Sequence, residues 1–160
     1  MDEFSDDNAP RLEPDSPPPD LLPPIDLNES EWSGVRAAGL VIVDPDGRIW
    51  IRKPRNHFGG YKWTWPKGTL AAGEHPQAAA HRETWEETGL TARIDSMLGD
   101  YAGDTSMTRF YLAHRVGGSP SVSDETSMLG LATWDEAASL LHKKRDLDVF
   151  AEARARLARG

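Results

Sequence analysis

The sequence has no cysteine. This absence excludes disulfides, cysteine nucleophiles and zinc sites built from thiolates. No apolar run approaches the roughly 20 residues that a membrane-spanning helix needs. The first ten residues, MDEFSDDNAP, also lack the apolar stretch of a secretory signal. We therefore expect a cytoplasmic protein that makes no contact with a membrane.

Basic residues are nearly absent from residues 1–30, which contain nine acidic residues and a single basic residue, Arg11. The net charge of −8 carried by the 160-residue chain therefore belongs to this segment. Proline is frequent here and large apolar residues are few, a composition that predicts a disordered, acidic, proline-rich tail. A docking arm for a basic partner or for a polyproline-binding partner is the alternative interpretation.

Residues 31–160 have the length and patterning of one mixed α/β domain. Their charges balance, and their apolar residues fall into short runs bounded by turn sequences such as DPDG. Continuous or alternating apolar patterns predict strands over residues 34–43, 48–53, 61–65, 91–101 and 106–115.

Three helices follow from local start and stop signals. Pro76 is a favoured first helical residue, so a helix is predicted from there to the residue before Gly89. Thr133 and Glu136 have the spacing of a capping box at the start of a second helix. Asp146 is expected to cap a final helix that continues to about residue 158.

The end of the first predicted helix reads RETWEETG, which is unusually acidic. Glu83, Glu86 and Glu87 are spaced i, i+3 and i+4, so their carboxylates share one helical face. The C-terminal end of a helix carries partial negative charge and disfavours carboxylates. The stretch is therefore either a solvated acidic face or a site that holds a cation against three carboxylates.

A wider window, GTLAAGEHPQAAAHRETWEETGL, resembles the nudix box, G-x5-E-x7-R-E-U-x-E-E-x-G-U, in which U is apolar. The matching residues are Gly68, Glu74, Arg82, Glu83, Glu86, Glu87, Gly89 and Leu90. Thr84 stands at the first apolar position, and we expect its hydroxyl to bond back to the Ala80 carbonyl. The resemblance covers roughly residues 31–158. It implies the nudix fold, an α/β fold with a mixed β-sheet in an α/β/α sandwich.

Nudix hydrolases cleave a nucleoside diphosphate linked to another group, by attack of water on phosphorus. The resemblance therefore implies bound Mg²⁺, with Mn²⁺ as a possible substitute. Both are hard cations that prefer the carboxylate oxygens that Glu83, Glu86 and Glu87 offer. The resemblance adds a backbone carbonyl ligand at Lys67 and Gly68. Such a cation would neutralise phosphate oxygens and lower the pKa of bound water.

Catalytic roles are also implied by the resemblance. Arg82, together with Glu74, is expected to brace the glycine loop against the helix. The downstream sequence SDETS offers Asp124 and Glu125 as a further ligand or base, and we favour Glu125. The general base stays open between Glu83 and Glu125.

The substrate is indicated by a stretch without acidic residues, from residue 48 to residue 67. Its basic side chains are either a chance cluster or a phosphate-binding rim, and in the second case Arg52, Lys62 and Lys67 bind substrate. Tyr61 is placed to stack on a base. The sequences WPKG and WDEAASLL resemble bacterial diadenosine polyphosphate hydrolases.

These features favour a dinucleoside polyphosphate such as Ap4A as substrate. ADP-ribose, an oxidised nucleotide and capped RNA are alternatives, and a non-catalytic nudix-fold nucleotide sensor is a different class of function. We expect a small-molecule nucleotide rather than a nucleic acid as partner. The resemblance also allows a homodimer, and it leaves the partner of the acidic tail unspecified.

Overall fold

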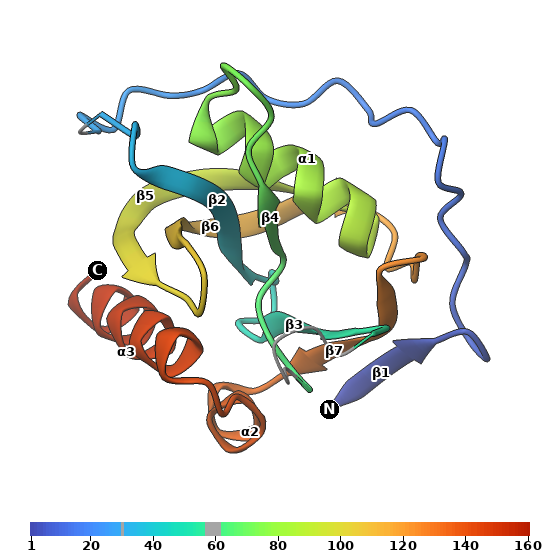
Figure 1. Cartoon of the computed structure of the whole chain (residues 1–160). Coiled ribbons are helices and arrows are strands. Elements are labelled where there is room, and N and C mark those ends of the chain that lie inside the picture. The colour runs from blue at the N-terminus through green and yellow to red at the C-terminus, as the bar shows by residue number, and fades with distance from the viewer. Residues whose placement is uncertain (30, 57–61) are drawn as a thin grey trace.

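The computed structural model describes residues 1–29, 31–56 and 62–160 (Figure 1). Seven strands of this described part form one sheet in the order β1-β7-β3-β2-β6-β5, and β4 pairs with β2 beside that path. The strands are β1 (Asp2–Ser5), β2 (Val35–Val43), β3 (Ile49–Pro54), β4 (Lys67–Thr69), β5 (Leu90–Ala102), β6 (Met107–Gly118) and β7 (Thr126–Ala132). The helices are α1 (Pro76–Thr88), α2 (Trp134–Leu140) and α3 (Lys144–Arg159).

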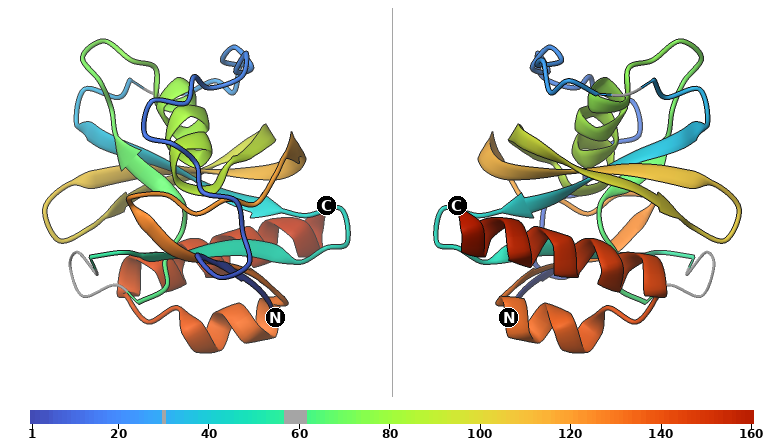
Figure 2. Two further views of the ribbon diagram at one scale, coloured as in Figure 1. Left: turned by 90° about the vertical axis from the view of Figure 1, so that its right-hand side faces the viewer. Right: turned by 90° about the vertical axis from the view of Figure 1, so that its left-hand side faces the viewer.

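The sheet lies between two helical layers, α1 on one face and α2 with α3 on the other (Figure 2). Because side chains alternate along a strand, β2 sends Leu40 and Ile42 toward α1 and Val41 toward α3. Strand β2 runs parallel to β6 and antiparallel to β3 and β4. The predicted mixed sheet in an α/β/α sandwich is confirmed.

Helix α1 has the predicted bounds. Pro76 occupies the first turn, and the His75 side chain accepts a hydrogen bond from the Gln77 amide at 3.0 Å. Gly89 ends the helix in the left-handed conformation, with φ 71°. A residue with a Cβ would be strained there, and it would also meet the Ser119 carbonyl oxygen at 2.5 Å. The glycine therefore fixes where the acidic face stops.

Of the two C-terminal helices, α2 has the predicted cap and α3 does not. The Thr133–Glu136 capping box of α2 is present in both directions. Helix α3 starts at Lys144, and the prediction that Asp146 caps it is wrong. Asp146 lies fully buried in the first turn, where its carboxylate accepts a hydrogen bond from the Thr64 hydroxyl at 2.7 Å. A tertiary contact to a distant hydroxyl decides the role of this carboxylate, and local sequence does not show it.

The aromatic stretch before the glycine loop is less regular than predicted. Within the described residues it forms a single bridge, between Thr64 and Arg52, in place of a strand. Trp63 and Trp65 both pack into the core on the α3 side. Tyr61 lies outside the described residues, so its expected contact with a base stays a prediction. Strand β7 was not predicted.

Residues 1–29 contain a strand that their composition does not predict. Strand β1 pairs antiparallel with β7, from Asp2 opposite Leu131 to Ser5 opposite Met128. The chain then runs around the α1 side of the molecule to β2 (Figure 1). Composition predicts disorder because it counts few apolar residues, whereas an open sheet edge offers backbone hydrogen bonds that require no particular side chain. The division of the chain near residue 30 stays a prediction.

The same segment also carries a buried charge. Glu29 is almost fully enclosed, and its carboxylate contacts the Arg109 guanidinium at 3.2 Å. Arg109 is fully buried and is also bonded to Asp100 at 2.7 Å.

No helix in the described part of the chain is long and apolar enough to cross a membrane. The cytoplasmic location and the homodimer stay predictions.

Candidate functional site

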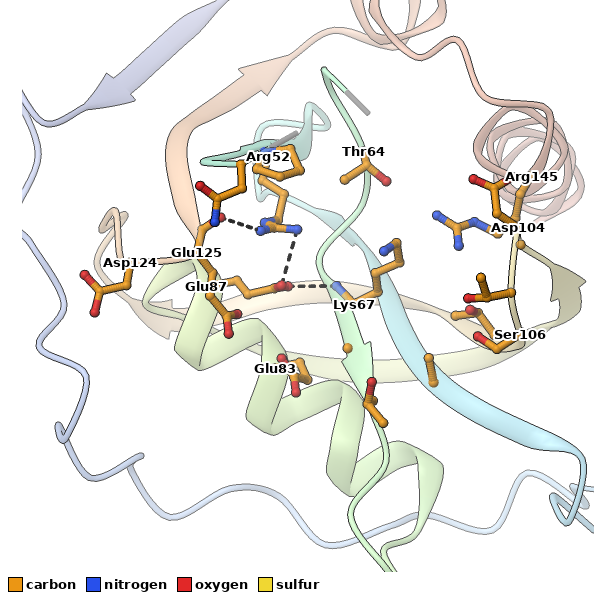
Figure 3. A pocket seen from close by; sticks show the side chains of 18 residues that line it. Arg52, Thr64, Lys67, Glu83, Glu87, Asp104, Ser106, Asp124, Glu125 and Arg145 are labelled. Atoms are coloured by element: carbon orange, nitrogen blue, oxygen red, sulfur yellow. Dashed lines mark hydrogen bonds and ion pairs between the residues drawn. The ribbon is translucent and has the colours of Figure 1, made fainter. Parts of the chain in front are cut away.

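Three glutamates from two parts of the chain meet at one end of the sheet. Glu83 and Glu87 project from α1, and Glu125 projects from the loop before β7 (Figure 3). Each offers a carboxylate oxygen, and these oxygens lie within 4.8 Å of one another. Glu83 and Glu87 are buried, whereas Glu125 is exposed. The structure thus brings the predicted Glu125 to two glutamates that lie about 40 residues earlier in the chain.

Gly68 makes room for Glu83. A Cβ on residue 68 would lie 2.1 Å from the Glu83 Cδ and 2.3 Å from its Oε2. Real Cβ atoms do not approach so closely, so any other residue would displace the carboxylate or the loop. The glycine is required by this close approach and not by an unusual backbone angle.

Glu87 is held from two sides. The backbone amide of Lys67 donates to Glu87 Oε1 at 2.8 Å, and the Arg52 guanidinium contacts Oε2 at 3.2 Å. Arg52 also donates to the Thr126 hydroxyl and to the Glu125 carbonyl oxygen, each at 2.9 Å. The structure therefore places Arg52, a predicted substrate ligand, in contacts that join Glu87 to the loop carrying Glu125.

Arg82 ties the glycine loop to α1, as the family resemblance implies. Its guanidinium contacts both oxygens of Glu74, at 2.9 and 3.0 Å, and donates to the Thr69 carbonyl oxygen at 3.0 Å. The same group reaches Glu83 at 2.9 Å and Glu86 at 3.3 Å. It therefore orients one acid of the cluster while bracing the loop.

Two other predicted residues lie apart from the three meeting oxygens. Glu86 is not in the cluster, and its half-exposed carboxylate pairs with Arg82 one turn from Glu83. Lys62 is exposed and does not line the cavity next to the cluster. The ligand role of Glu86 and the substrate role of Lys62 stay predictions.

The cluster is electrostatically unfavourable as it stands. Burial, with the neighbouring Glu86 and Glu125 charges, raises the pKa of Glu83 to about 7, although Arg82 opposes this shift. Burial and the Glu83 charge raise the pKa of Glu87 to about 8, against the opposing effect of Arg52. Buried carboxylates that repel one another are stabilised by a cation. Three converging oxygens next to a backbone loop suit Mg²⁺ or Mn²⁺, so the donor set fits the metal that the resemblance implies.

A cavity of about 610 Å³ opens beside the cluster. Lys67 and Arg145 line this cavity, and Arg145 lies with Asp104 and Ser106 across from the glutamates (Figure 3). Burial and the charge of Arg145 lower the pKa of Lys67. Lys67 was predicted to line the site, and Arg145 was missed. A single arginine in the basic run HKKRD gives no sign that α3 turns it inward.

Thr84, the one departure from the nudix box pattern, lowers the stability of the fold. Its hydroxyl is buried and has no hydrogen-bond partner among the described residues, so the expected bond to Ala80 is absent. Ala80 is fully buried in the core. The Thr88 hydroxyl donates a hydrogen bond to the Thr84 carbonyl oxygen at 2.6 Å. An enclosed hydroxyl without a partner is destabilising.

Comparison with known protein families identifies the chain. The NUDIX domain model matches residues 34–153, which is most of the sequence. The chain belongs to the NUDIX domain family. The matched region contains α1, the Gly68 loop and the loop with Glu125, so the cluster described above lies within the NUDIX domain of this chain.

Individual relatives carry names that agree with this assignment. A "MutT-like protein" of Streptomyces ambofaciens is 33% identical over 118 residues, which is 72% of this chain and 73% of that protein. An "RNA pyrophosphohydrolase" of Caulobacter vibrioides is 41% identical over 54 residues, which is 34% of this chain and only 31% of the relative's length. The structure of a C. elegans Ap4A hydrolase binary complex superposes with a TM-score of 0.67 at 23% identity, and it covers 78% of this chain and 100% of that one.

Proposed function

We propose that this NUDIX domain is a Mg²⁺-dependent pyrophosphohydrolase that cleaves a nucleoside diphosphate linked to another group. One observation carries the proposal: the oxygens of Glu83, Glu87 and Glu125 converge within 4.8 Å beside a cavity of nucleotide size. A nucleotide sensor needs the cavity but not three converging acids that repel one another. Hydrolysis of a phosphoanhydride needs both.

Glu83, Glu87 and Glu125 would hold the metal. Glu86 and a backbone carbonyl of Lys67 or Gly68 would be further ligands. When bound, Mg²⁺ or Mn²⁺ supplies charge neutralisation for the phosphate oxygens and a more acidic water. Arg52 fixes the orientation of Glu87 through its contact at 3.2 Å. We assign Arg52 to this positioning in preference to contact with substrate.

Glu83 is our choice for the general base, and Glu125 is the alternative. Its carboxylate is held by Arg82 at 2.9 Å and is confined by Gly68, so its orientation is fixed. Burial raises its pKa to about 7, which is near the optimum for a group that accepts a proton at neutral pH. Arg82 thus acts through Glu83, by orienting the oxygen that takes the proton from the attacking water.

The substrate that we favour is a dinucleoside polyphosphate such as Ap4A. Support comes from Lys67 and Arg145, which line the cavity and offer positive charge to phosphates beyond the scissile pair. ADP-ribose and oxidised nucleotides have shorter phosphate chains than Ap4A, and these two and capped RNA are the comparison substrates.

A phosphate-release assay with Mg²⁺ over this nucleotide panel tests the function, with Glu87→Gln as the inactive control. We expect turnover by the wild type that depends on Mg²⁺ and is highest for four or more phosphates. Nucleotide binding without turnover of any substrate would identify a sensor. A clear preference for ADP-ribose would overturn the substrate and leave the hydrolase standing.

A further inference from the structure

The N-terminal segment passes directly beside the loop that carries Glu125. The Val122 amide donates to the Pro10 carbonyl oxygen at 3.1 Å, and the Leu12 amide donates to the Val122 carbonyl oxygen at 2.8 Å. The two backbones form a parallel bridge between Arg11 and Val122. A segment more than 100 residues away in the sequence is therefore bonded to the chain three residues before Glu125.

Charged side chains continue this contact toward the cluster. Asp6 contacts the Arg55 guanidinium at 3.0 Å and Arg11 at 3.3 Å. Arg11 in turn pairs with Asp124, the residue next to Glu125. Both Asp124 and Glu125 line the cavity beside the metal-binding acids (Figure 3). The segment therefore reaches the immediate neighbour of a cluster residue.

Arg55 joins the N-terminal segment to the turn at residues 123–126, which contains Glu125. Its guanidinium donates to the Ser123 carbonyl oxygen at 2.8 Å and to the Thr126 carbonyl oxygen at 3.2 Å. The Arg55 amide also donates to the Glu125 carbonyl oxygen at 2.9 Å. Asp6 accepts from the same guanidinium, so it holds Arg55 in the orientation in which it grips both ends of the turn.

Glu125 is the member of the cluster that needs such support. Glu83 and Glu87 are buried on a helix and fixed by Arg82 and Arg52, whereas Glu125 is exposed on a loop. A loop ligand contributes to metal binding only while the loop occupies the right geometry, and small displacements of such groups are costly.

We propose that the N-terminal segment positions Glu125 for metal binding, with Asp6 and Arg11 as the positioning residues. The inference rests on the metal site of the proposed function. Each exposed ion pair is weak alone. Two of them act on the same loop together with a backbone bridge, so their loss lowers the population of the loop in its binding geometry.

Mn²⁺ binding, measured as free Mn²⁺ by electron paramagnetic resonance, tests this role without using turnover. The test variant is the double substitution Asp6→Asn with Arg11→Gln. The matched control is Asp2→Asn, which removes another ion pair between the segment and the domain, the Asp2–Arg48 contact at 3.1 Å. Arg11→Lys retains the charge, and Glu125→Gln sets the largest effect that displacement of Glu125 can cause.

We expect the double variant to bind Mn²⁺ about three- to tenfold more weakly, as the loss of two modest ion pairs implies. Asp2→Asn and Arg11→Lys should bind like the wild type, and thermal melts should show similar small changes in the double variant and in Asp2→Asn. Equal Mn²⁺ affinities for the double variant and Asp2→Asn would overturn the positioning role alone. A wild type that binds no Mn²⁺ would overturn the metal site of the proposed function.

Discussion

Gly68 and Glu83 fit against each other so closely that a Cβ on residue 68 would lie 2.1 Å from the Glu83 Cδ. We predict that Gly68→Ala displaces the carboxylate and lowers turnover by about 10²-fold, the cost typical of misplacing a catalytic group by about 1 Å. Gly34→Ala is the matched control, because nothing lies within 4 Å of a Cβ there. Turnover and circular dichroism should be measured together. Full activity in Gly68→Ala would show that Glu83 does not need its present position.

Removing one charge from the acidic face tests the metal ligands. Glu86→Gln and Glu87→Gln should each lose most of the Mg²⁺-dependent turnover, by about 10²-fold or more, since a bound metal supplies several kcal/mol of charge stabilisation. The fold should persist, because Glu86 is half exposed and a glutamine oxygen at position 87 can still accept a hydrogen bond from Arg52, which also keeps its bonds to Thr126 and Glu125. Activity close to that of the wild type in Glu86→Gln would remove it from the ligand set.

Arg145 and Asp104 both line the cavity, and removing their opposite charges should change substrate preference in opposite directions. Arg145→Met should lower the catalytic efficiency for Ap4A about 5- to 30-fold relative to ADP-ribose, the effect of losing one charge-assisted contact of ~1–2 kcal/mol. Asp104→Asn removes a negative charge from the same cavity and should favour Ap4A further. Arg145→Lys keeps the charge and serves as the control. Equal losses on both substrates would mean that Arg145 contacts no additional phosphate.

Thr84 offers a test of stability that is separate from catalysis. Thr84→Val removes a buried hydroxyl without a described partner at nearly constant volume, so it should raise the free energy of unfolding by about 1–2 kcal/mol. Thr88→Val, on the same helix, removes a hydroxyl that bonds to the Thr84 carbonyl oxygen at 2.6 Å and should be destabilising. Urea unfolding would measure both. A destabilised Thr84→Val would mean that the hydroxyl has a bound water as partner.

The pH of the solution should control how strongly Mg²⁺ stabilises the protein. The folded, metal-free chain holds Glu87 with a pKa of about 8, raised by burial and Glu83 and opposed by Arg52 and Lys67. A raised carboxyl pKa favours the folded state at low pH, and that contribution is lost as the pH rises toward 8. Mg²⁺ binds the ionised form, so its stabilising effect should grow from pH 6 to pH 8. The increase in Tm on adding Mg²⁺ should be recorded at each pH, and an increase independent of pH would contradict this assignment.

The parts of the structure that sequence predicted well are those encoded locally. Pro76 and Gly89 define α1 because each satisfies a backbone requirement of a helix end. The Thr133–Glu136 box does the same for α2. The spacing within the acidic stretch then places Glu83 and Glu87 on one face without any knowledge of the sheet.

What sequence did not predict depends on contacts between distant segments. Arg145 lines the cavity only because α3 packs across the sheet, and Asp146 is occupied by Thr64 instead of a helix end. Strand β1 exists because β7 leaves an edge open, and nothing in the acidic stretch around it indicates a strand. Distance from the nudix box indicates Glu125, but it does not indicate the contacts that the neighbouring Val122 and Asp124 make with the first 12 residues.

The Glu29–Arg109 contact has a practical consequence for anyone who produces this protein. The family match begins at residue 34, so a recombinant chain cut at that boundary would keep every matched residue and lose Glu29. Arg109, fully buried, would then retain Asp100 as its carboxylate partner from β5 and lose the second one. Removing one partner of a buried charge is among the more damaging changes that a fold can suffer. A chain with only the matched residues therefore lacks one partner of a buried arginine, and a useful truncation should retain Glu29.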